Sequence, residues 1–287
     1  MLHRQYDSYM ACDADYRDAD IVMFGAPFDS TTSNRPGARF GPRAIRQESF
    51  GLETYSPWLD QDLTDYAIFD AGDLELPFGD SEQTMALIRE QTAAILKDGK
   101  RPLMLGGEHS LTLGAVQAAL EQYPQLHLIH FDAHTDLREE YLGVRYSHAS
   151  VIRRCWDLMG DGRIAQFGIR SGERSEFAWA KEHTHLRPFD FTGLEDVMAA
   201  WNKDGKPIYF TLDLDVLDPG FFPGTGTPEA GGVSFKELMK ALQLVMTGNV
   251  VACDVMELAP GLDMSGVSTA TACKVVREML LLWSASK

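Results

Sequence analysis

The sequence predicts an α/β protein of three layers, with helices on both faces of a mostly parallel β-sheet. Short apolar segments alternate along the chain with longer segments of helical pattern, which is the order of strand–helix–strand units. The apolar segments also lack the polar–apolar alternation of a strand with one face in water. Strands of this kind are buried on both faces, as in a parallel sheet that helices cover.

We expect strands where the short apolar segments occur. They are Asp20–Phe24, Tyr66–Asp70, Pro102–Leu105, Leu126–Phe131, Arg163–Ile169, Pro207–Leu212 and Val250–Met256, with a minor strand near His185–Phe189. The longer segments between and after them are expected to be helices. They are Ser81–Lys97, Ser110–Gln122, His148–Leu158, Glu173–Glu182, Leu194–Asn202, Ser234–Thr247 and Ser265–Ser284.

We expect residues 1–287 to form a single domain, in which residues 1–19 are an N-terminal extension. The sequence contains no internal repeat, low-complexity tract or interdomain linker. Gly and Pro are concentrated in two segments, Arg35–Pro42 and Pro219–Gly232. Long loops of this composition within a compact domain are more often functional than passive, so we interpret both as functional loops.

The formal charge of −16 arises from 42 acidic and 26 basic residues, and the basic residues are scattered. An acidic field disfavours nucleic acid and anionic membranes and favours cationic small molecules. No apolar run approaches the roughly 20 residues of a membrane span, and the N-terminal residues lack the apolar core of a signal peptide. We therefore expect a cytoplasmic protein without nucleic-acid or membrane partners.

The four cysteines are far apart in the sequence: Cys12, Cys155, Cys253 and Cys273. Because none forms a CxxC pair, we interpret them as reduced, partly buried thiols. A catalytic role for Cys155 would require a nearby base, which the sequence does not identify.

Polar residues follow three of the expected strands at their carboxyl ends, where a parallel sheet forms its ligand crevice. In the first set, Gly106–Ser110, His109 stands where a strand ends and a helix begins. The paired glycines permit a tight turn and a close backbone approach. Taken alone, His109 is better explained as an incidental residue of a helix-capping turn, in which Ser110 is the cap.

The second set follows Leu126–Phe131 and consists of Asp132, His134 and Asp136. If the chain stays extended there, these alternate residues point the same way, and two carboxylates converge with an imidazole. A solvated acidic loop is the alternative. The apolar strand that leads directly into the cluster argues against it, because carboxylates packed together are unfavourable unless a cation neutralises them.

The third set follows Pro207–Leu212, where Asp213 and Asp215 share one face of an extended chain. Turn-forming aspartates are the alternative interpretation. It fits Asp218, which precedes Pro219, but it does not fit Asp213, which lies between apolar neighbours.

Together the three strand ends supply two histidines and four aspartates, a set of N and O ligands that suits Mn²⁺ better than structural zinc. Six ligands exceed the need of one octahedral ion that also binds water, whereas two ions about 3.5–4 Å apart can share carboxylates. We therefore expect two metal ions, with a single ion as the alternative. The predicted ligands are His109, Asp132, His134, Asp136, Asp213 and Asp215. Within the strand, His127 and His130 are expected to be packed and hydrogen-bonded, without a partner at metal-ligand spacing.

These motifs resemble the metal-binding signatures of the ureohydrolases, the family of arginase, agmatinase and formiminoglutamase. The matching segments are Gly107–Ser110, Asp132–Asp136 and Asp213–Pro219, with further similarity at Gly25–Asp29, Arg35–Arg46 and Asp254–Glu257. The resemblance extends from about Ile21 to the C-terminus. It implies a single α/β domain with an eight-stranded parallel sheet, a binuclear Mn²⁺ site and a trimeric or hexameric homo-oligomer.

The resemblance also assigns roles to the metal ligands. His109, Asp132 and Asp136, with Asp213 or Asp215, would hold one ion. His134 would hold the other together with the shared aspartates. Asp132 and Asp213 are the expected bridging carboxylates.

The implied reaction is attack of a metal-bound hydroxide on the carbon of a guanidinium group, with Asp136 accepting a hydrogen bond from the hydroxide. By the same resemblance, His148 would transfer a proton to the leaving amine. Glu257 would bind the guanidinium through two parallel hydrogen bonds. Structural alternatives stay open for both residues: a polar helix start for His148, and a buried ion pair with an arginine for Glu257.

Among the ureohydrolases the chain most resembles the agmatinases, which implies hydrolysis of agmatine to putrescine and urea. Gly224–Gly232 resembles the agmatinase form of the loop after the third motif. Tyr141–Ser147 is apolar and aromatic where arginases carry Ser and Asn, and such a lining suits the methylene chain of agmatine. Arg145 could instead bind a carboxylate, but a solvent-facing arginine is the favoured interpretation of this residue.

Other functions therefore stay open. Within the family, they are guanidinobutyrase, guanidinopropionase and arginase. A single-zinc amide deacetylase shares the sheet architecture, but His109 and Asp136 argue against it because they complete a second metal site. A non-catalytic binding protein would be marked by the loss of a ligand, and none is missing.

Overall fold

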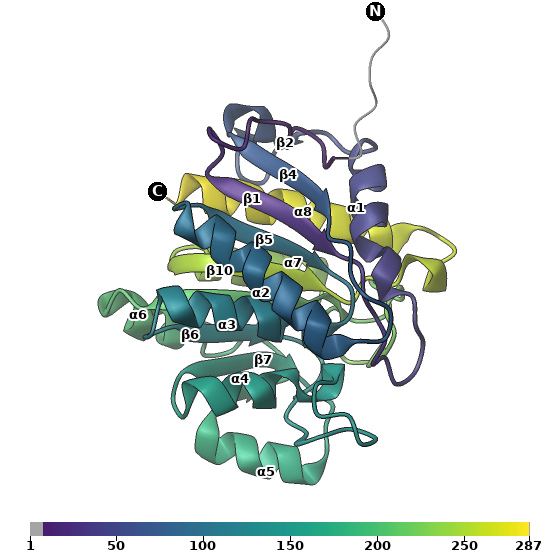
Figure 1. Cartoon of the computed structure of the whole chain (residues 1–287), viewed down its shortest axis with the longest axis vertical. Helices are drawn as coiled ribbons and strands as arrows, with labels where there is room; N and C mark the ends of the chain where they lie inside the picture. Colours follow the sequence, from purple (N-terminus) through teal and green to yellow (C-terminus); the bar gives the residue numbers. More distant parts are fainter. Residues whose placement is uncertain (1–7, 287) are drawn as a thin grey trace, which may run out of the picture.

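Eight parallel strands form the central sheet of the computed structural model, which describes residues 8–286 (Figure 1). Their order is β4-β1-β5-β10-β9-β6-β7-β8, and each neighbouring pair runs parallel. The bounds are β1 Ile21–Ala26, β4 Ile68–Asp73, β5 Arg101–Gly106, β6 His127–Phe131, β7 Ile164–Ile169, β8 His185–Pro188, β9 Pro207–Asp213 and β10 Asn249–Met256. The predicted α/β fold with a parallel eight-stranded sheet is confirmed.

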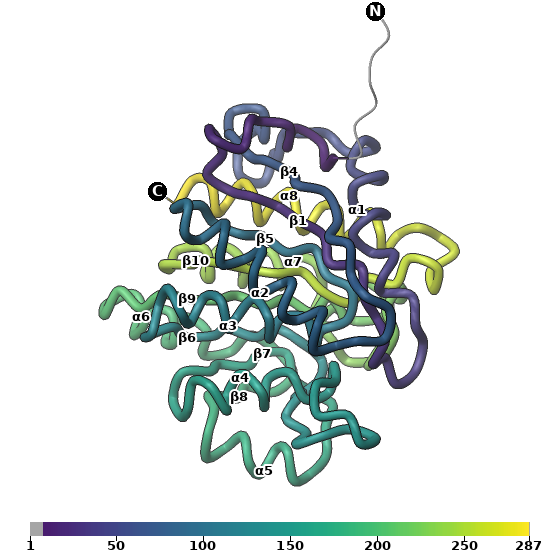
Figure 2. The backbone as a smooth tube through the Cα atoms, viewed as in Figure 1, coloured from purple at the N-terminus to yellow at the C-terminus, as the bar shows by residue number. Residues whose placement is uncertain are grey.

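Helices cover both faces of the sheet, which gives the three predicted layers. One face is covered by α2 Ser81–Lys97, α3 Thr112–Gln122, α4 Val151–Met159 and α5 Arg174–His183. The other is covered by α1 Gly41–Ser49, α6 Leu194–Lys203, α7 Phe235–Val245 and α8 Val267–Ala285. Figure 2 shows α2, α3 and α4 crossing the near face of the sheet, with α7 and α8 behind the strands.

The side chains of each strand enter two apolar cores in alternation. On β5, Leu103 and Leu105 belong to the core that includes α7 and α8, whereas Met104 belongs to the core that includes α2 and α3. All three residues are fully buried because helices cover both faces. This arrangement explains why the strand sequences are apolar throughout.

Some elements are not evident from the sequence pattern. Helix α1 begins at Gly41, inside the Gly- and Pro-rich segment, and carries Pro42 in its first turn, where a missing N–H is tolerated. Strands β2 Tyr55–Ser56 and β3 Gln61–Asp62 pair to form a two-stranded antiparallel ribbon. Strands of two residues are too short to produce a recognisable periodicity.

Two helices start later than expected because a 3₁₀ turn precedes each of them. His109–Leu111 forms such a turn before α3, and His148–Ser150 forms one before α4. Both histidines therefore stand in tight turns ahead of a helix rather than inside its first α-helical turn.

The segment expected as an N-terminal extension is part of the packed structure from Tyr9 onward. Tyr9, Met10 and Cys12 are buried, and the Tyr9 hydroxyl donates a hydrogen bond of 2.7 Å to the carbonyl of Cys273 on α8. Residues 1–7 of this segment lie outside the described residues.

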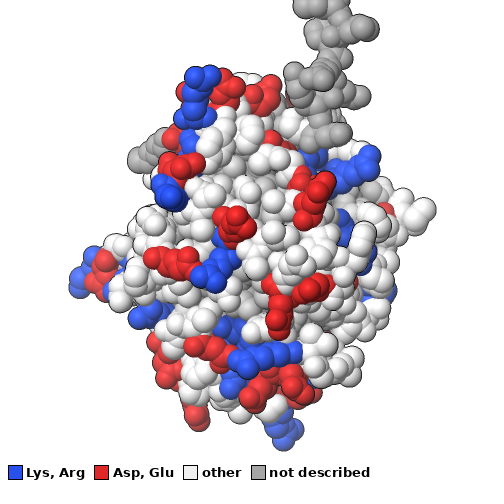
Figure 3. Space-filling view, viewed as in Figure 1, with Lys and Arg blue, Asp and Glu red and all other residues white. Residues whose placement is uncertain are grey.

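Charged side chains are mixed on the surface. Figure 3 shows acidic and basic residues interspersed among uncharged ones on one face of the molecule. Within residues 8–286, no helix is long and apolar enough to cross a membrane. The four cysteines are all free and buried, which confirms the interpretation of them as unpaired thiols.

Candidate metal centre

Four adjacent strands end at the candidate site. They are β5, β10, β9 and β6, in this order across the sheet. His109 follows β5, Asp132 follows β6, Asp213 ends β9 and Glu257 follows β10. Because parallel strands present their carboxyl ends at one edge, these side chains meet although they come from distant parts of the sequence.

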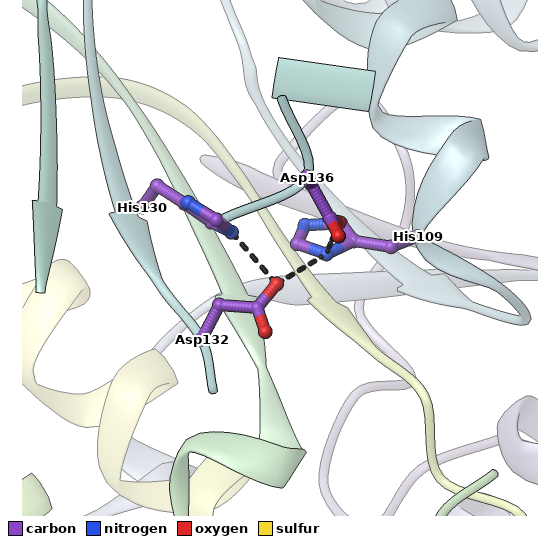
Figure 4. A group of neighbouring side chains, drawn as sticks. All are labelled: His109, His130, Asp132 and Asp136. Atoms are coloured by element: carbon purple, nitrogen blue, oxygen red, sulfur yellow. Dashed lines mark hydrogen bonds and ion pairs between the residues drawn. The ribbon is translucent and has the colours of Figure 1, made fainter. Parts of the chain in front are cut away.

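His109 lies at the centre of the first group of ligand atoms (Figure 4). Its Nδ1 is 3.0 Å from Oδ2 of Asp132 and 3.3 Å from Oδ2 of both Asp136 and Asp213. All four side chains are buried. Among the described residues, this Nδ1 has no hydrogen bond of normal geometry, although three carboxylate oxygens surround it. A buried imidazole nitrogen that faces several carboxylates is the donor arrangement that a divalent cation takes.

A second group of ligand atoms lies on the other side of Asp132. Nδ1 of His134 is 3.3 Å from Oδ1 of Asp132 and 3.1 Å from Oδ2 of Asp215. Asp132 thus presents Oδ2 to His109 and Oδ1 to His134. The distances group Asp213 with His109 and Asp215 with His134, so Asp132 is the carboxylate that stands between two groups of donors.

The segment after β6 does not stay extended, contrary to the expectation for Asp132–Asp136. Asp136 has a φ of +51°, so the chain turns through the left-handed region at this residue. The turn is held by Glu176, which accepts hydrogen bonds from the Thr135 hydroxyl at 2.6 Å and the Leu137 N–H at 3.1 Å. The Asp136 side chain reaches Nδ1 of His109 through this turn, and not through strand alternation.

The site holds more negative charge than its histidines balance. Burial, and then the neighbouring Asp132, raise the pKa of Asp136 to about 7. Burial, Asp215 and Asp132 likewise raise the pKa of Asp213 well above its ordinary value. Burial alone would raise the pKa of Asp132 as well, but His130, His109 and His134 hold it well below the usual range. Buried carboxyl groups with raised pKa values, such as Asp136 and Asp213, bind a cation favourably because the cation removes their mutual repulsion.

His130 was not expected to have a partner at metal-ligand spacing, and this expectation is wrong. Its Nε2 lies 2.8 Å from Oδ2 of Asp132, within the first group (Figure 4). The amide nitrogen of Gln166 lies 3.1 Å from Nδ1 and also donates to the carbonyl of Thr135 at 2.8 Å. With Nδ1 accepting from Gln166, the proton of His130 is on Nε2, which makes it a donor to Asp132. The expected packing and hydrogen bonding of His130 are present.

His148 lies beside this cluster, in the wall of a cavity of about 230 Å³ that His134 and Asp136 also line. Its Nε2 is 3.0 Å from the Ser33 hydroxyl, and its backbone N–H donates to the Thr31 hydroxyl at 3.1 Å. Burial, and then the neighbouring His134, lower the pKa of His148 to about 4. The ring is therefore neutral near pH 7 and can accept a proton.

Glu257 is buried beside the metal-ligand groups, with a φ of +66°. Its Oε1 accepts a hydrogen bond of 2.7 Å from the backbone N–H of His109. Burial and the neighbouring carboxyl of Glu108 raise the pKa of Glu257 well above its ordinary value. This hydrogen bond joins Glu257 to a backbone amide and not to an arginine, which does not favour the alternative of a buried ion pair.

The two Gly- and Pro-rich segments lie against each other at this edge of the sheet. Asn34 donates a hydrogen bond of 3.1 Å to the carbonyl of Gly226, and Arg35 donates one of 2.8 Å to the carbonyl of Thr225. Thr227 lines the cavity and lies 3.4 Å from Asp215. Both segments are therefore next to the site.

The segment expected to form an apolar substrate lining does so only in part. Tyr141 lines the cavity, but Leu142 and Val144 are exposed. Arg145 is also exposed and lies 3.5 Å from Asp157, outside the lining of the cavity. The arginine in the cavity wall is Arg138, which the sequence pattern did not single out.

Several buried polar residues around the site were also missed from the sequence. Glu108, within the first motif, accepts hydrogen bonds from the backbone N–H of Thr31 at 2.7 Å and from the Ser110 hydroxyl. Asp254, on β10, accepts hydrogen bonds from the hydroxyl groups of Thr112 and Tyr209. An acidic residue inside an otherwise apolar strand was the available signal for Asp254.

A buried cluster of histidines and aspartates at the carboxyl ends of a parallel sheet defines a metal-binding α/β enzyme. The profile of the arginase family matches residues 19–282. The chain belongs to the arginase family and is a ureohydrolase.

Individual relatives are similar over nearly the whole chain. The agmatinase of Bacillus subtilis is 45% identical over 277 residues, which cover 95% of each protein. The crystal structure of a putative agmatinase from Clostridium difficile has a TM-score of 0.91 and 50% identity, with 94% of this chain and 99% of that chain covered. The mitochondrial guanidino acid hydrolase of Homo sapiens is 35% identical, with coverage of 91% of this chain and 77% of the human protein.

Proposed function

We propose that this protein hydrolyses agmatine to putrescine and urea at a centre that holds two Mn²⁺ ions. The observation that carries the proposal is the position of Asp132, whose two oxygens face two separate groups of ligand atoms, around His109 and His134. The similarity to proteins named agmatinase supports the choice of substrate. Among the described residues, Nδ1 of buried His109 has no hydrogen bond of normal geometry, which supports a role as a metal ligand.

The proposed ligands are His109, Asp132, His134, Asp136, Asp213 and Asp215. When bound, the two ions would act as Lewis acids and would lower the pKa of the attacking water. The donor set of imidazole and carboxylate groups supports Mn²⁺ as the resident metal.

The protein side chains would orient the reactants and move the protons. Asp136 would accept a hydrogen bond from the attacking water. Glu257, buried next to His109, would bind the guanidinium through its free carboxylate oxygen. His148, held neutral in the cavity wall, would carry a proton from the water to the departing amine as the carbon–nitrogen bond breaks. Water supplies the oxygen of urea, and both of its hydrogens pass to the leaving nitrogen, so the guanidinium and water give urea and an ammonium group.

The cavity wall supports a substrate with a cationic tail. Arg138 lines this wall, but it forms an ion pair of 2.8 Å with Glu173 and lies 3.9 Å from Glu176. Its guanidinium also stacks over the Tyr141 ring, 4.4 Å from the ring centre. Because two acidic groups already balance this arginine, it attracts a substrate carboxylate weakly. Agmatine ends in an ammonium group and needs no such partner.

A guanidino acid is the second candidate substrate. The presence of Arg138 in the cavity and the similarity to the human guanidino acid hydrolase support it. In this case the Arg138 guanidinium would leave Glu173 and bind the carboxylate of the substrate.

Urea release from agmatine, arginine and 4-guanidinobutyrate, measured with purified protein and Mn²⁺, tests the proposal. We expect agmatine to react much faster than the other two. Faster release from 4-guanidinobutyrate would select the second candidate, and faster release from arginine would overturn both. The Asp132→Asn variant serves as the control for contaminating activity.

We further propose that the chain is one domain, forms a trimer or hexamer and is located in the cytoplasm. The ureohydrolase resemblance supports the oligomer. The four free cysteines support a reducing compartment.

A further inference from the structure

We propose that Asp254, acting through Thr211, is a positioning residue that keeps Nδ1 of His109 free to bind metal. This inference rests on the metal centre of the proposed function, but not on the identity of the substrate. Asp254 does not face the ligand cavity and takes no part in the chemistry described above.

Asp254 is a fully buried carboxylate in the middle of the central strand β10. Its Oδ2 accepts hydrogen bonds from the Thr112 hydroxyl at 2.8 Å and from the Tyr209 hydroxyl at 2.6 Å. Its other oxygen, Oδ1, has no partner of normal geometry among the described residues. Burial raises the pKa of Asp254 above its ordinary value, and nearby His109 and the surrounding hydroxyl groups offset this rise only in part.

A buried carboxylate surrounded by hydroxyl groups is costly for the fold. An ionised group removed from water loses its hydration, and neutral donors compensate only in part. Well-packed residues of similar volume usually give equal or greater stability at such positions. A carboxyl group buried at this position therefore indicates a role other than stabilising the fold.

The sheet register connects Asp254 to the metal centre. Asp254 on β10 is the direct neighbour of Thr211 on β9. The Thr211 hydroxyl lies 2.8 Å from Nε2 of His109, the ring nitrogen that faces away from the carboxylate cluster. The Thr211 hydroxyl also lies 3.4 Å from the Thr112 hydroxyl, which donates to the Asp254 carboxylate. This route from His109 therefore ends at Asp254.

The direction of these hydrogen bonds decides which nitrogen of His109 can bind metal. A neutral imidazole carries one N–H, so Nδ1 can be a ligand only when the proton is on Nε2. Because the Thr112 hydroxyl donates its proton to Asp254, the Thr112 oxygen is left to accept from the Thr211 hydroxyl, 3.4 Å away. The Thr211 oxygen is then left to accept from Nε2–H of His109. A neutral group at position 254 would allow the hydroxyl to turn, donate to Nε2 and place the proton on Nδ1.

The test measures Mn²⁺ binding to the full-length protein by calorimetry, with the number of bound ions and the thermal midpoint of each variant. Thr211→Val removes the hydroxyl at nearly constant volume, and Asp254→Asn replaces the accepting carboxyl group by an amide that can also donate. Thr211→Ser retains the hydroxyl. Tyr209→Phe is the matched control, because it removes a hydrogen bond to the same carboxylate from a residue that does not contact His109.

We expect Thr211→Val and Asp254→Asn to raise the Kd of one of the two ions by about 10- to 100-fold, as for other groups that orient metal-bound histidines. Thr211→Ser should restore the wild-type Kd. Tyr209→Phe should lower the thermal midpoint and leave the Kd unchanged. If Asp254→Asn does not fold, the Kd values of Thr211→Val and Thr211→Ser decide whether the hydroxyl at position 211 is required for metal binding.

The inference is overturned if Thr211→Val binds both ions with the wild-type Kd. It is also overturned if Tyr209→Phe weakens binding as much as Thr211→Val does, since the effect would then be one of packing. A wild-type protein that binds two Mn²⁺ ions without hydrolysing agmatine would refute the proposed function alone, because metal affinity still tests Asp254. A wild-type protein that binds no Mn²⁺ would refute both.

Discussion

Nδ1 of His134 lies 3.1 Å from Oδ2 of Asp215, although one residue follows β6 and the other follows β9. The two strands are neighbours in the sheet, so the contact is a direct result of the topology. Asp132 connects this pair to His109, because its Oδ1 faces His134 and its Oδ2 faces His109.

Asp132→Asn should reduce the bound Mn²⁺ below two ions per chain and slow urea release by more than about 100-fold, because both groups of donors share this carboxylate. Metal content by atomic absorption and the rate with agmatine are the measurements. Asp218→Asn is a suitable control, since Asp218 lies in the third motif but accepts hydrogen bonds from Gly220, Gly231 and Gly232. Two ions retained in Asp132→Asn would contradict the assignment.

His148→Asn should lower kcat for agmatine by about 10²- to 10⁴-fold, the range for loss of a proton-transfer group. Both Mn²⁺ ions should stay bound, because His148 lies in the cavity wall and outside the two groups of ligand atoms. Steady-state kinetics and metal analysis separate the two effects. His127→Gln, altered at the opposite end of β6, should retain wild-type kcat. A wild-type kcat in His148→Asn would remove this residue from the mechanism.

The two arginines near the cavity should differ in their effect on substrate preference. Arg138→Ala should lower the ratio of kcat/KM for 4-guanidinobutyrate to that for agmatine by about two- to fivefold, as expected for one partly exposed charge. Arg145→Ala should leave this ratio unchanged, because Arg145 points to Asp157 on the surface. The reverse pattern would show that the loop adopts another arrangement with substrate bound.

Removal of the metal should make stability depend on pH. In the metal-free protein, burial and Asp132 raise the pKa of Asp136 to about 7, so the folded state retains a proton that the unfolded state loses near its ordinary pKa. Unfolding then releases a proton, and stability falls as the pH rises from about 4 through 7. The raised pKa values of Asp213 and His109 act in the same direction, whereas the lowered pKa of His148 opposes them below its ordinary value of 6.5.

The thermal midpoint of protein treated with a chelator should therefore be lower at pH 8 than at pH 5.5. Addition of Mn²⁺ should abolish most of this difference, since bound cations stabilise the ionised carboxylates. A metal-free midpoint that rises over this interval would contradict the charge balance of the site.

The four cysteines should not react with a thiol reagent at pH 8 while the protein is folded. Burial raises the pKa of Cys155 and Cys253 well above the ordinary value, and all four thiols are buried. Thiolate is the reactive form, so the rate should be close to zero until denaturant is added. Four thiols should then react. Rapid modification of one cysteine in the folded protein would show local opening at that position.

Much of the fold was predictable because the strands are buried on both faces. An uninterrupted apolar segment such as Leu126–Phe131 ends abruptly at polar residues, which locates both the strand and its carboxyl end. The short ribbon at Tyr55–Ser56 and helix α1 gave no such signal. A two-residue strand has no periodicity, and the start of α1 lies within a segment whose Gly and Pro content is typical of a loop.

The site was predictable as a set of residues but not as an arrangement. Asp132 and Asp136 were expected to align through an extended chain, whereas a left-handed turn at Asp136 brings them together. His130 was predicted to be a packed, hydrogen-bonded residue. It donates to Asp132 because the Gln166 amide donates to Nδ1, which places the ring proton on Nε2. Hydrogen-bond direction depends on neighbours from other strands, which a local pattern does not contain.

The sequence by itself identified the imidazole and carboxylate groups that meet at one edge of the sheet, because such groups at the ends of apolar strands are costly to bury unless they bind a cation. Only the tertiary structure decided their grouping. The strands β5 and β6 follow each other in the chain, yet β10 and β9 lie between them in the sheet. Strand order depends on how helices and sheet pack over the whole chain, so the partnership of Asp254 with His109 could be seen only in the fold.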